Sequence, residues 1–156
     1  MQALDILYRK YYADVYRFAY MTTQNSATAE DIAQTVFLKI TKCANQYRAT
    51  GSAKGWILKI TRSIALNVLR HNSWDHNANL DDLLNVPSQD DDFEGVEFLA
   101  SLGELPPAMK EIVVLHVAYQ LKHHEIAKIL SKSPSAVRQQ YRRAIGLLKE
   151  EYHKQN

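Results

Sequence analysis

The segment Ser131–Leu148, SKSPSAVRQQYRRAIGLL, carries basic and amide side chains at helical spacing. Ser133 followed by Pro134 is typical of a helix start, because the hydroxyl can accept from a free backbone N–H and proline at the first helical position needs no N–H partner. At about 100° per residue, apolar and polar residues fall on opposite sides of this helix. The apolar stripe comprises Val137, Tyr141, Ile145 and Leu148, and the polar side comprises Gln139, Arg142 and Arg143 with Arg138 on its flank. Such a side donates hydrogen bonds to anions, and a solvated basic surface is the alternative explanation.

The residues just before this segment, YQLKHHEIAKIL, predict a second, shorter amphipathic helix. Its apolar positions are Leu121, Ile126, Ile129 and Leu130, and a turn at Ser131–Ser133 follows. A helix, a short turn and a helix with a basic outer side form the helix-turn-helix arrangement, whose second helix enters the major groove of DNA. Arginine there can pair with guanine and glutamine with adenine. Ser131 departs from the common pattern, which has glycine in the turn.

Composition favours a helical protein, since 46% of the 156 residues are hydrophobic and only 5 are glycine and 4 proline. The single cysteine, Cys43, excludes an internal disulfide and a cysteine-based zinc site, and suits a reducing cytoplasm. The N-terminal stretch MQALDILYRK is amphipathic rather than typical of a signal peptide. The chain has no apolar run of about 18 residues, so no membrane-spanning helix is expected.

Charge is strongly segregated along the chain. Residues 1–70 hold 10 Lys/Arg against 4 Asp/Glu, a net charge of +6, and residues 105–156 hold 9 against 4, a net charge of +5. Residues 71–104 hold 9 Asp/Glu and no Lys/Arg, a net charge of −9. This pattern predicts two basic modules joined by an acidic linker, and basic modules attract polyanions. The acidic run at Asp90–Asp92 is typical of a solvated linker, and the alternative is that it mimics nucleic acid and keeps the modules from DNA.

Periodicity predicts an all-α protein of two small helical modules, an N-terminal bundle at residues 1–72 and a helix-turn-helix module at residues 102–156, with the linker at 73–101. The N-terminal bundle contains three predicted helices. The first runs from about Ala3 to Thr22, the second starts near Thr28 with a capping box to Asp31, and the third runs from about Lys54 to Arg70. The inward residues predicted for these helices include Leu4, Leu7, Tyr8, Tyr11, Val15, Phe18 and Ala19 in the first and Ile57, Ile60, Ile64 and Val68 in the third.

A catalytic or metal site has weak support in the sequence. The histidines His116, His123 and His124 with Glu125 are the main cluster, but HHEIA lacks the i, i+4 histidine pair of a zinc protease helix. The chain also has no glycine-rich phosphate loop and no nucleophilic serine elbow. We therefore expect neither catalysis, nor a metal, nor a cofactor.

Three stretches together resemble one family. Residues 29–40 (AEDIAQTVFLKI), 55–70 (GWILKITRSIALNVLR) and 102–144 (LGELPPAMKEIVVLHVAYQLKHHEIAKILSKSPSAVRQQYRRA) resemble, in that order, the bacterial sigma-70 family. The short chain with two modules resembles its extracytoplasmic-function (ECF) group. The resemblance implies a non-enzymatic factor that binds core RNA polymerase and directs promoter-specific initiation. It also implies a cognate anti-sigma factor as a partner.

Two rival functions remain at this point. One is a one-component helix-turn-helix regulator that acts without core polymerase, although the match at residues 55–70 argues against it because a simple repressor has no use for a melting module. The other is a helical adaptor whose basic faces bind an acidic protein.

The resemblance also implies roles for individual residues. In the N-terminal module, the candidate polymerase contacts are Asp31, Gln34, Thr35 and Leu38, while Phe37 and Ile40 are expected in the core. The candidates for holding the melted minus-10 element are Tyr47, Arg48, Lys54, Lys59, Arg62, Ser63, Asn67 and Arg70. Ser63 stands where members of the family often have asparagine, and Trp56 is expected to be a core anchor rather than a base-stacking residue. In the C-terminal module, the candidates for reading the minus-35 duplex are Arg138, Gln139, Arg142 and Arg143, with Lys122, His123 and Lys132 on the adjacent DNA backbone.

Overall fold

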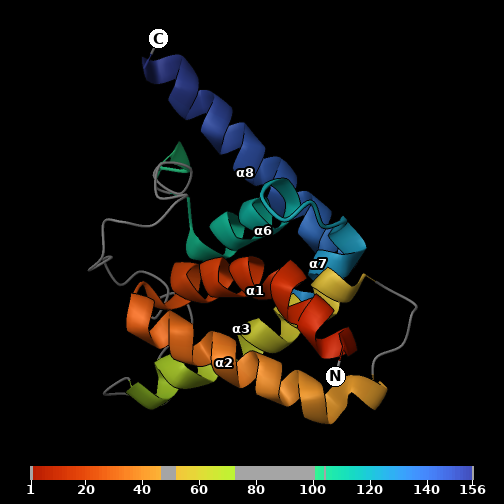
Figure 1. Cartoon of the computed structure of the whole chain (residues 1–156). Coiled ribbons are helices and arrows are strands. Elements are labelled where there is room, and N and C mark those ends of the chain that lie inside the picture. Colours follow the sequence, from red (N-terminus) through yellow and green to blue (C-terminus); the bar gives the residue numbers. More distant parts are fainter. Residues whose placement is uncertain (1, 47–51, 73–100, 104, 156) are drawn as a thin grey trace. The chain divides into compact units, whose positions relative to one another are not determined.

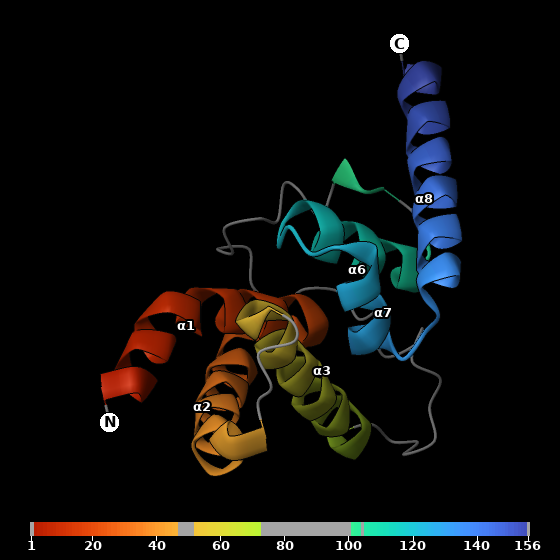
Figure 2. The same cartoon turned by 90° about the vertical axis from the view of Figure 1, so that its right-hand side faces the viewer.

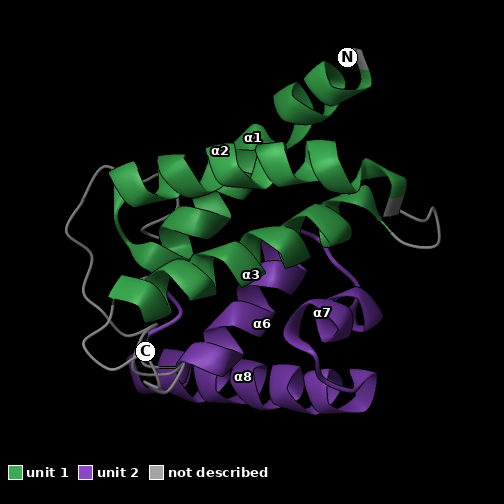
Figure 3. Cartoon of the chain, turned by 90° about the horizontal axis from the view of Figure 1, so that it is seen from below, with its two compact units in different colours: residues 1–90 green, residues 91–156 purple. Residues whose placement is uncertain are grey.

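The computed structural model describes residues 2–46, 52–72, 101–103 and 105–155, and every regular element assigned in these ranges is helical (Figure 1). The all-α prediction is confirmed. The chain divides into two compact units, residues 1–90 and 91–156, which are coloured separately in Figure 3. Over the described ranges, no helix is both long enough and apolar enough to cross a membrane.

In the described part of the first unit, three helices form a bundle: α1 (Gln2–Thr23), α2 (Ser26–Cys43) and α3 (Ala53–Asn72). A short 3-10 helix, η1 (Ala44–Gln46), follows α2. Each of the three long helices contacts the other two, and Figure 2 shows them by label. The core between them is apolar and fully buried, and it includes Val15, Phe18, Ile32, Val36, Ile40, Ile57 and Leu58. Burial of this apolar surface, at about 25 cal/mol per Å², is the main term that stabilises the bundle.

The start of α2 differs from the prediction. Asn25 is the N-cap, and its side-chain oxygen accepts a hydrogen bond from the Thr28 backbone N–H at 2.9 Å. The predicted start at Thr28 is therefore wrong, because Thr28 already lies in the first turn. The asparagine satisfies one of the N–H groups that a helix start leaves without a partner.

The buried side of α3 is also rotated from the predicted one. Ile57 is buried as predicted, but Ile60, Ile64 and Val68 are only half-buried. The fully buried positions are instead Leu58, Thr61, Ala65 and Leu66. The reason is that α3 packs against both α1 and α2, where the small Ala65 and Thr61 allow close approach. The Thr61 hydroxyl is satisfied by donating to the Ile57 carbonyl at 2.8 Å.

The second unit contains α6 (Pro107–Val117), α7 (His123–Leu130) and α8 (Pro134–Gln155). The four apolar residues predicted for the first helix of the pair, Leu121, Ile126, Ile129 and Leu130, are all buried. Ser133 caps α8 as predicted, with its hydroxyl accepting from the Ala136 N–H at 3.2 Å. Pro134 is the first residue of α8. Val137 and Ala144 are completely buried, so α8 packs against α6 and α7 through its first three turns.

The turn between α7 and α8 depends on a left-handed residue. Ser131 has φ 54° and ψ 44° and ends α7, and the following N–H, of Lys132, donates to the Ala127 carbonyl at 2.9 Å. Glycine is the usual residue in this conformation, because a side chain there costs about 1–2 kcal/mol. The turn expected from the sequence therefore exists with its usual geometry, and serine adopts it at a cost.

An aromatic cluster joins α6, α7 and α8. The ring centroids of His116, His123 and Tyr141 lie 4.6 to 5.2 Å apart, edge to face. His116 donates from Nδ1 to the Leu121 carbonyl at 2.9 Å. The buried Nδ1 of His123 has no hydrogen-bond partner among the described residues. Burial, with the nearby His116 and Arg138, lowers the pKa of His123 below its usual 6.5.

Ser131→Gly is expected to raise the free energy of unfolding of the second unit by about 1 kcal/mol. Glycine adopts the left-handed conformation without the steric cost of a side chain, but it also makes the unfolded chain more flexible, which cancels part of the stabilisation. Hydrogen exchange of the α7 and α8 amides measures this. Tryptophan fluorescence does not, because Trp56 and Trp74 both precede residue 91. Lys128→Gly, at an exposed helical position of α7, is the matched control and should destabilise instead. An equal loss of stability in both variants would contradict the prediction.

The pH dependence of the second unit should follow from His123. Its pKa is lower in the folded than in the unfolded chain, so above pH 6.5 the imidazole is neutral in both states. As the pH falls below 6.5 the unfolded state binds the proton first, so the free energy of unfolding should decrease until the folded-state pKa is passed. Protection of α8 amides at pH 7.5 and 5.5 tests this. His123→Phe should lose this contribution, whereas His124→Phe, at an exposed neighbouring position, should keep it.

Candidate nucleic-acid interface

The polar side of α8 faces solvent, as the sequence predicts. Arg138, Gln139, Arg142 and Arg143 are all exposed, while Val137 and Ala144 on the opposite side are buried. The carboxylates of this helix, Glu150 and Glu151, lie toward its C-terminal end. The first turns of α8 therefore present arginine and glutamine donors together, without an acidic side chain between them. This composition suits phosphates and base edges.

The residues predicted to contact the DNA backbone have different surroundings. Lys122 is exposed and precedes the first residue of α7. His123 packs in the aromatic cluster, where its lowered pKa favours the neutral ring over a cation. Lys132 is half-buried, and its ammonium donates to the side-chain oxygen of Gln140 at 3.0 Å.

Gln140 did not stand out in the sequence. The bond from Lys132 joins the turn to the second turn of α8, so its two residues do not lie on the same helix. A pattern search along one helix therefore has no signal for this pair.

A second polar surface lies on α3. Lys59, Ser63, Asn67 and Arg70 are exposed and recur every three or four residues, so they share one side of the helix. Arg62 is half-buried on the flank of this side. Lys54 lies in the first turn at i−4 and i−7 from the buried Leu58 and Thr61, so the structure does not bring it onto the same side. Tyr47 and Arg48 lie outside the described residues, and Trp56 is half-buried.

The α2 residues predicted to contact polymerase form an exposed strip. Asp31, Gln34, Thr35 and Leu38 all face solvent, and the Thr35 hydroxyl donates to the Asp31 carbonyl at 2.9 Å. Leu38 is 66% exposed, which is unusual for a leucine on a helix that packs in a bundle. Phe37 and Ile40 are 6% and 1% exposed, so their predicted place in the core is confirmed.

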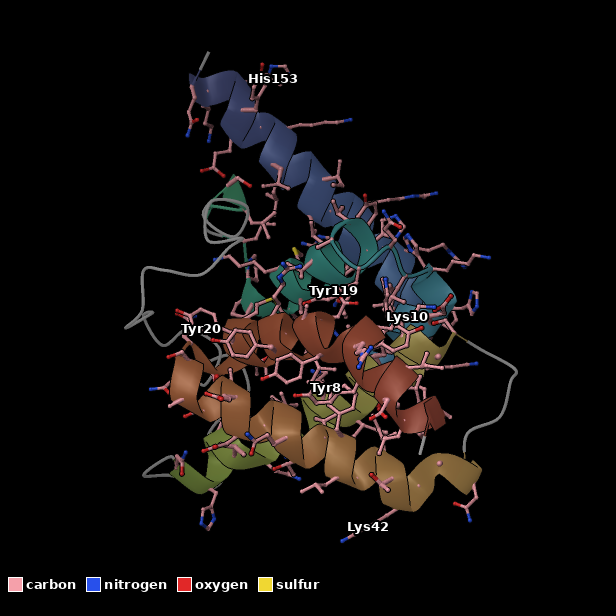
Figure 4. All side chains as sticks on the ribbon, in the orientation of Figure 1. Tyr8, Lys10, Tyr20, Lys42, Tyr119 and His153 are labelled. Carbon is pink, nitrogen blue, oxygen red and sulfur yellow. The ribbon has the colours of Figure 1, made fainter. Side chains whose placement is uncertain are left out.

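A row of tyrosines on α1 was not predicted as a surface. Tyr8, Tyr12, Tyr16 and Tyr20 follow one another at i, i+4 spacing, with neighbouring ring centroids 4.9, 6.4 and 6.3 Å apart. Figure 4 labels the two ends of the row, Tyr8 and Tyr20. Tyr8 was predicted to point inward, but it is 44% exposed and packs on Phe37 of α2. Burial, followed by Tyr8, Glu30 and Tyr16, raises the pKa of Tyr12. The spacing of four residues between these tyrosines was the sequence signal that could have predicted the row.

Comparison with known proteins adds relatives for both units. Sigma-70 region 2 matches residues 7–75, and sigma-70 region 4 matches residues 95–148. The ECF RNA polymerase sigma factor SigE of Mycolicibacterium smegmatis is 30% identical over 152 residues, which cover 92% of this chain and 59% of that protein. The ECF sigma factor SigX of Bacillus subtilis is 23% identical, with 95% of this chain and 82% of that protein covered.

Solved structures share the fold at lower identity. The sigma factor RpoE of Bartonella quintana, in complex with the anti-sigma factor NepR, matches with a TM-score of 0.71 and 17% identity over 96% of each chain. CnrH, in complex with the cytosolic domain of CnrY, matches with a TM-score of 0.68 and 16% identity over 99% of this chain and 90% of that chain. With sigma-70 regions 2 and 4 both matched in order, and with ECF sigma factors as its relatives, this chain belongs to the sigma-70 family as an ECF RNA polymerase sigma factor, a non-catalytic subunit that directs transcription initiation.

Proposed function

We propose that this chain binds core RNA polymerase through its first unit and recognises promoter DNA with both units. The single observation that carries the proposal is the order of two basic helical segments, residues 1–70 with an exposed strip on α2 and residues 105–156 with a helix-turn-helix. In this proposal residues 1–72 and 102–156 are the working modules, and residues 73–101 are an acidic linker between them. The chain acts in the cytoplasm, where polymerase and promoter are found.

The polymerase contact is proposed on α2, at Asp31, Gln34, Thr35 and Leu38. Exposed apolar side chains ringed by polar ones are typical of the central contacts of protein interfaces. Leu38 has this setting, because it is 66% exposed and Gln34 and Thr35 lie one turn before it on the same helix. Asp31 and Gln34 then supply polar contacts at the rim.

The melted minus-10 strand is proposed to lie along α3. Lys59 and Arg70 neutralise phosphates at the two ends of the exposed side, and Ser63 and Asn67 lie between them with groups that hydrogen-bond to an unpaired base. Arg62 supports this side from its flank. Lys54, in the first turn of α3, remains in the proposal as a DNA contact. Tyr47 and Arg48 remain as contacts from the segment before α3, with Tyr47 offering a ring for stacking.

We propose that α8 binds in the major groove of the minus-35 duplex. Gln139 and Arg143 contact base edges, Arg138 and Arg142 contact bases or phosphates on the other flank, and Lys122, His123 and Lys132 lie against the DNA backbone. His123 contributes as a neutral hydrogen-bonding ring in this position, because the folded state disfavours its charged form.

An anti-sigma factor is the proposed regulatory partner. One solved structure that shares the fold is the complex of the sigma factor RpoE with the anti-sigma factor NepR. For this chain, the exposed α2 strip with the tyrosine row beside it offers an apolar surface for that partner. Occupying this surface would prevent polymerase from binding.

The polymerase proposal predicts that the purified chain supports initiation by bacterial core polymerase from a subset of a promoter library. Leu38→Ala should weaken association with core polymerase by about 1–2 kcal/mol, roughly 5- to 30-fold, because it removes an apolar interface contact. Equilibrium binding to core polymerase measures the change. Lys39→Ala, next to it and exposed, is the control for a surface substitution. A chain that binds duplex promoter DNA tightly but neither binds core polymerase nor supports initiation would favour the one-component regulator instead.

The minus-10 proposal predicts that Lys59→Ala combined with Arg62→Ala impairs promoter opening more than the first binding of duplex DNA. The two cations are expected to act on the single strand, which exists only after melting. Permanganate reactivity of unpaired thymines reports opening, and filter binding of the closed complex reports the first step. Lys10→Ala combined with Arg17→Ala, on α1, removes the same charge as a control. Unchanged thymine reactivity in the α3 double variant would place the single strand elsewhere.

A further inference from the structure

The bond between Lys132 and Gln140 has defined geometry at both ends. The backbone of Lys132 is held by its N–H bond to the Ala127 carbonyl, directly after the left-handed Ser131. Its ammonium reaches forward and donates to the Gln140 side-chain oxygen at 3.0 Å. Both side chains are half-buried, so this pair is more ordered than a pair of fully exposed side chains.

This bond sets which way the Gln140 amide is oriented. An ammonium can only donate hydrogen bonds, so the group that faces Lys132 must be the carbonyl oxygen of the amide and cannot be the NH2 group. The two N–H donors of Gln140 therefore point away from Lys132. The orientation follows from the chemistry of the two groups and does not depend on how the amide atoms are assigned.

A glutamine with its oxygen engaged reads bases differently from a free one. Bidentate recognition of adenine requires the amide oxygen to accept from N6 while the amide nitrogen donates to N7. An adenine amino group would have to share the Gln140 oxygen with the Lys132 ammonium, which is also a donor and already occupies one of the two acceptor positions of that oxygen. Guanine, with acceptors at O6 and N7, and thymine, with an acceptor at O4, accept from the free N–H groups without this conflict.

Gln140 lies on the part of α8 that is proposed to meet base edges. It directly follows the exposed Gln139, and Arg143 is three residues further along, which makes Gln140 and Arg143 neighbours on the helix surface. The polar group of Gln140 is therefore within reach of a base pair adjacent to the one that Arg143 contacts.

We propose that Lys132 is a positioning residue that holds Gln140 as a hydrogen-bond donor, and that Gln140 thereby selects guanine or thymine over adenine at one position of the minus-35 element. The inference rests on the proposed reading of minus-35 DNA by α8. It assigns a specificity role to Gln140, and it gives Lys132 a role beyond a phosphate contact.

The test measures binding of the holoenzyme, core polymerase with the full chain, to minus-35 duplexes in which each base pair is varied in turn. Lys132→Met should raise the relative affinity for adenine at one position by about 5- to 150-fold, the range of one good base contact. Gln140→Met should lose discrimination at that same position, and the double variant should match Gln140→Met alone. Lys132→Arg keeps a donor and should keep the wild-type preference. Lys128→Met, on the exposed side of α7, controls for the lost charge.

Two outcomes separate this inference from the function on which it rests. In the first outcome, Gln139→Ala and Arg143→Ala shift the base preference, but Lys132→Met weakens binding to every duplex equally and lowers the salt slope by about one. Lys132 is then only a phosphate contact, and the inference is overturned. If the wild-type holoenzyme shows no preference at any minus-35 position, the proposed reading by α8 fails and the inference fails with it. Circular dichroism of each variant confirms that the helices are retained.

Discussion

The left-handed turn at Ser131 is the constraint on which the exposed polar side of α8 depends. It reverses the chain between α7 and α8, and the hydrogen bond from Lys132 to Ala127 closes it. Because the turn fixes where α8 begins, it also determines which residues of α8 reach the core, namely Val137 and Ala144. The arginine and glutamine side chains lie on the opposite side of α8, which does not pack against the other helices and stays exposed. A serine in this conformation costs stability, which the apolar contacts of Ile126, Ile129 and Leu130 offset.

The two units position their exposed polar side chains in similar ways. In each, one helix is held by small or branched buried residues, Thr61 and Ala65 on α3 and Val137 and Ala144 on α8, and its opposite side carries the polar groups. Rigid helices place such groups more accurately than loops do, which matters for contacts that depend on hydrogen-bond direction. The basic charge of residues 1–70 and of residues 105–156 adds attraction to a polyanion, and this attraction is independent of base sequence and sensitive to salt.

The aromatic side chains are found both in the cores of the units and on their surfaces. In the second unit, His116, His123 and Tyr141 close the space between three helices, and this packing keeps His123 neutral near neutral pH. In the first unit, the tyrosine row on α1 runs from the exposed Tyr8 to the buried Tyr20, and the rings of Tyr8 and Tyr12 pack on Phe37 of α2. Of the four tyrosines only Tyr8 is exposed, so the row is mainly packing between α1 and α2.

The sequence alone determined the helical class, both basic modules, the cap of α8 and the exposed sides of α2 and α8, because each follows from local spacing, charge or turn chemistry. The order of the three motifs was enough to identify the family. The tertiary structure decided the rest. It rotated the buried side of α3, because two neighbouring helices rather than one set its orientation. The cap of α2 at Asn25 is a local contact with Thr28 that the predicted capping box missed. The tertiary structure also brought Lys132 to Gln140 and His123 to His116 and Tyr141. These last contacts join residues on different elements, so no periodicity along a single helix contains that information.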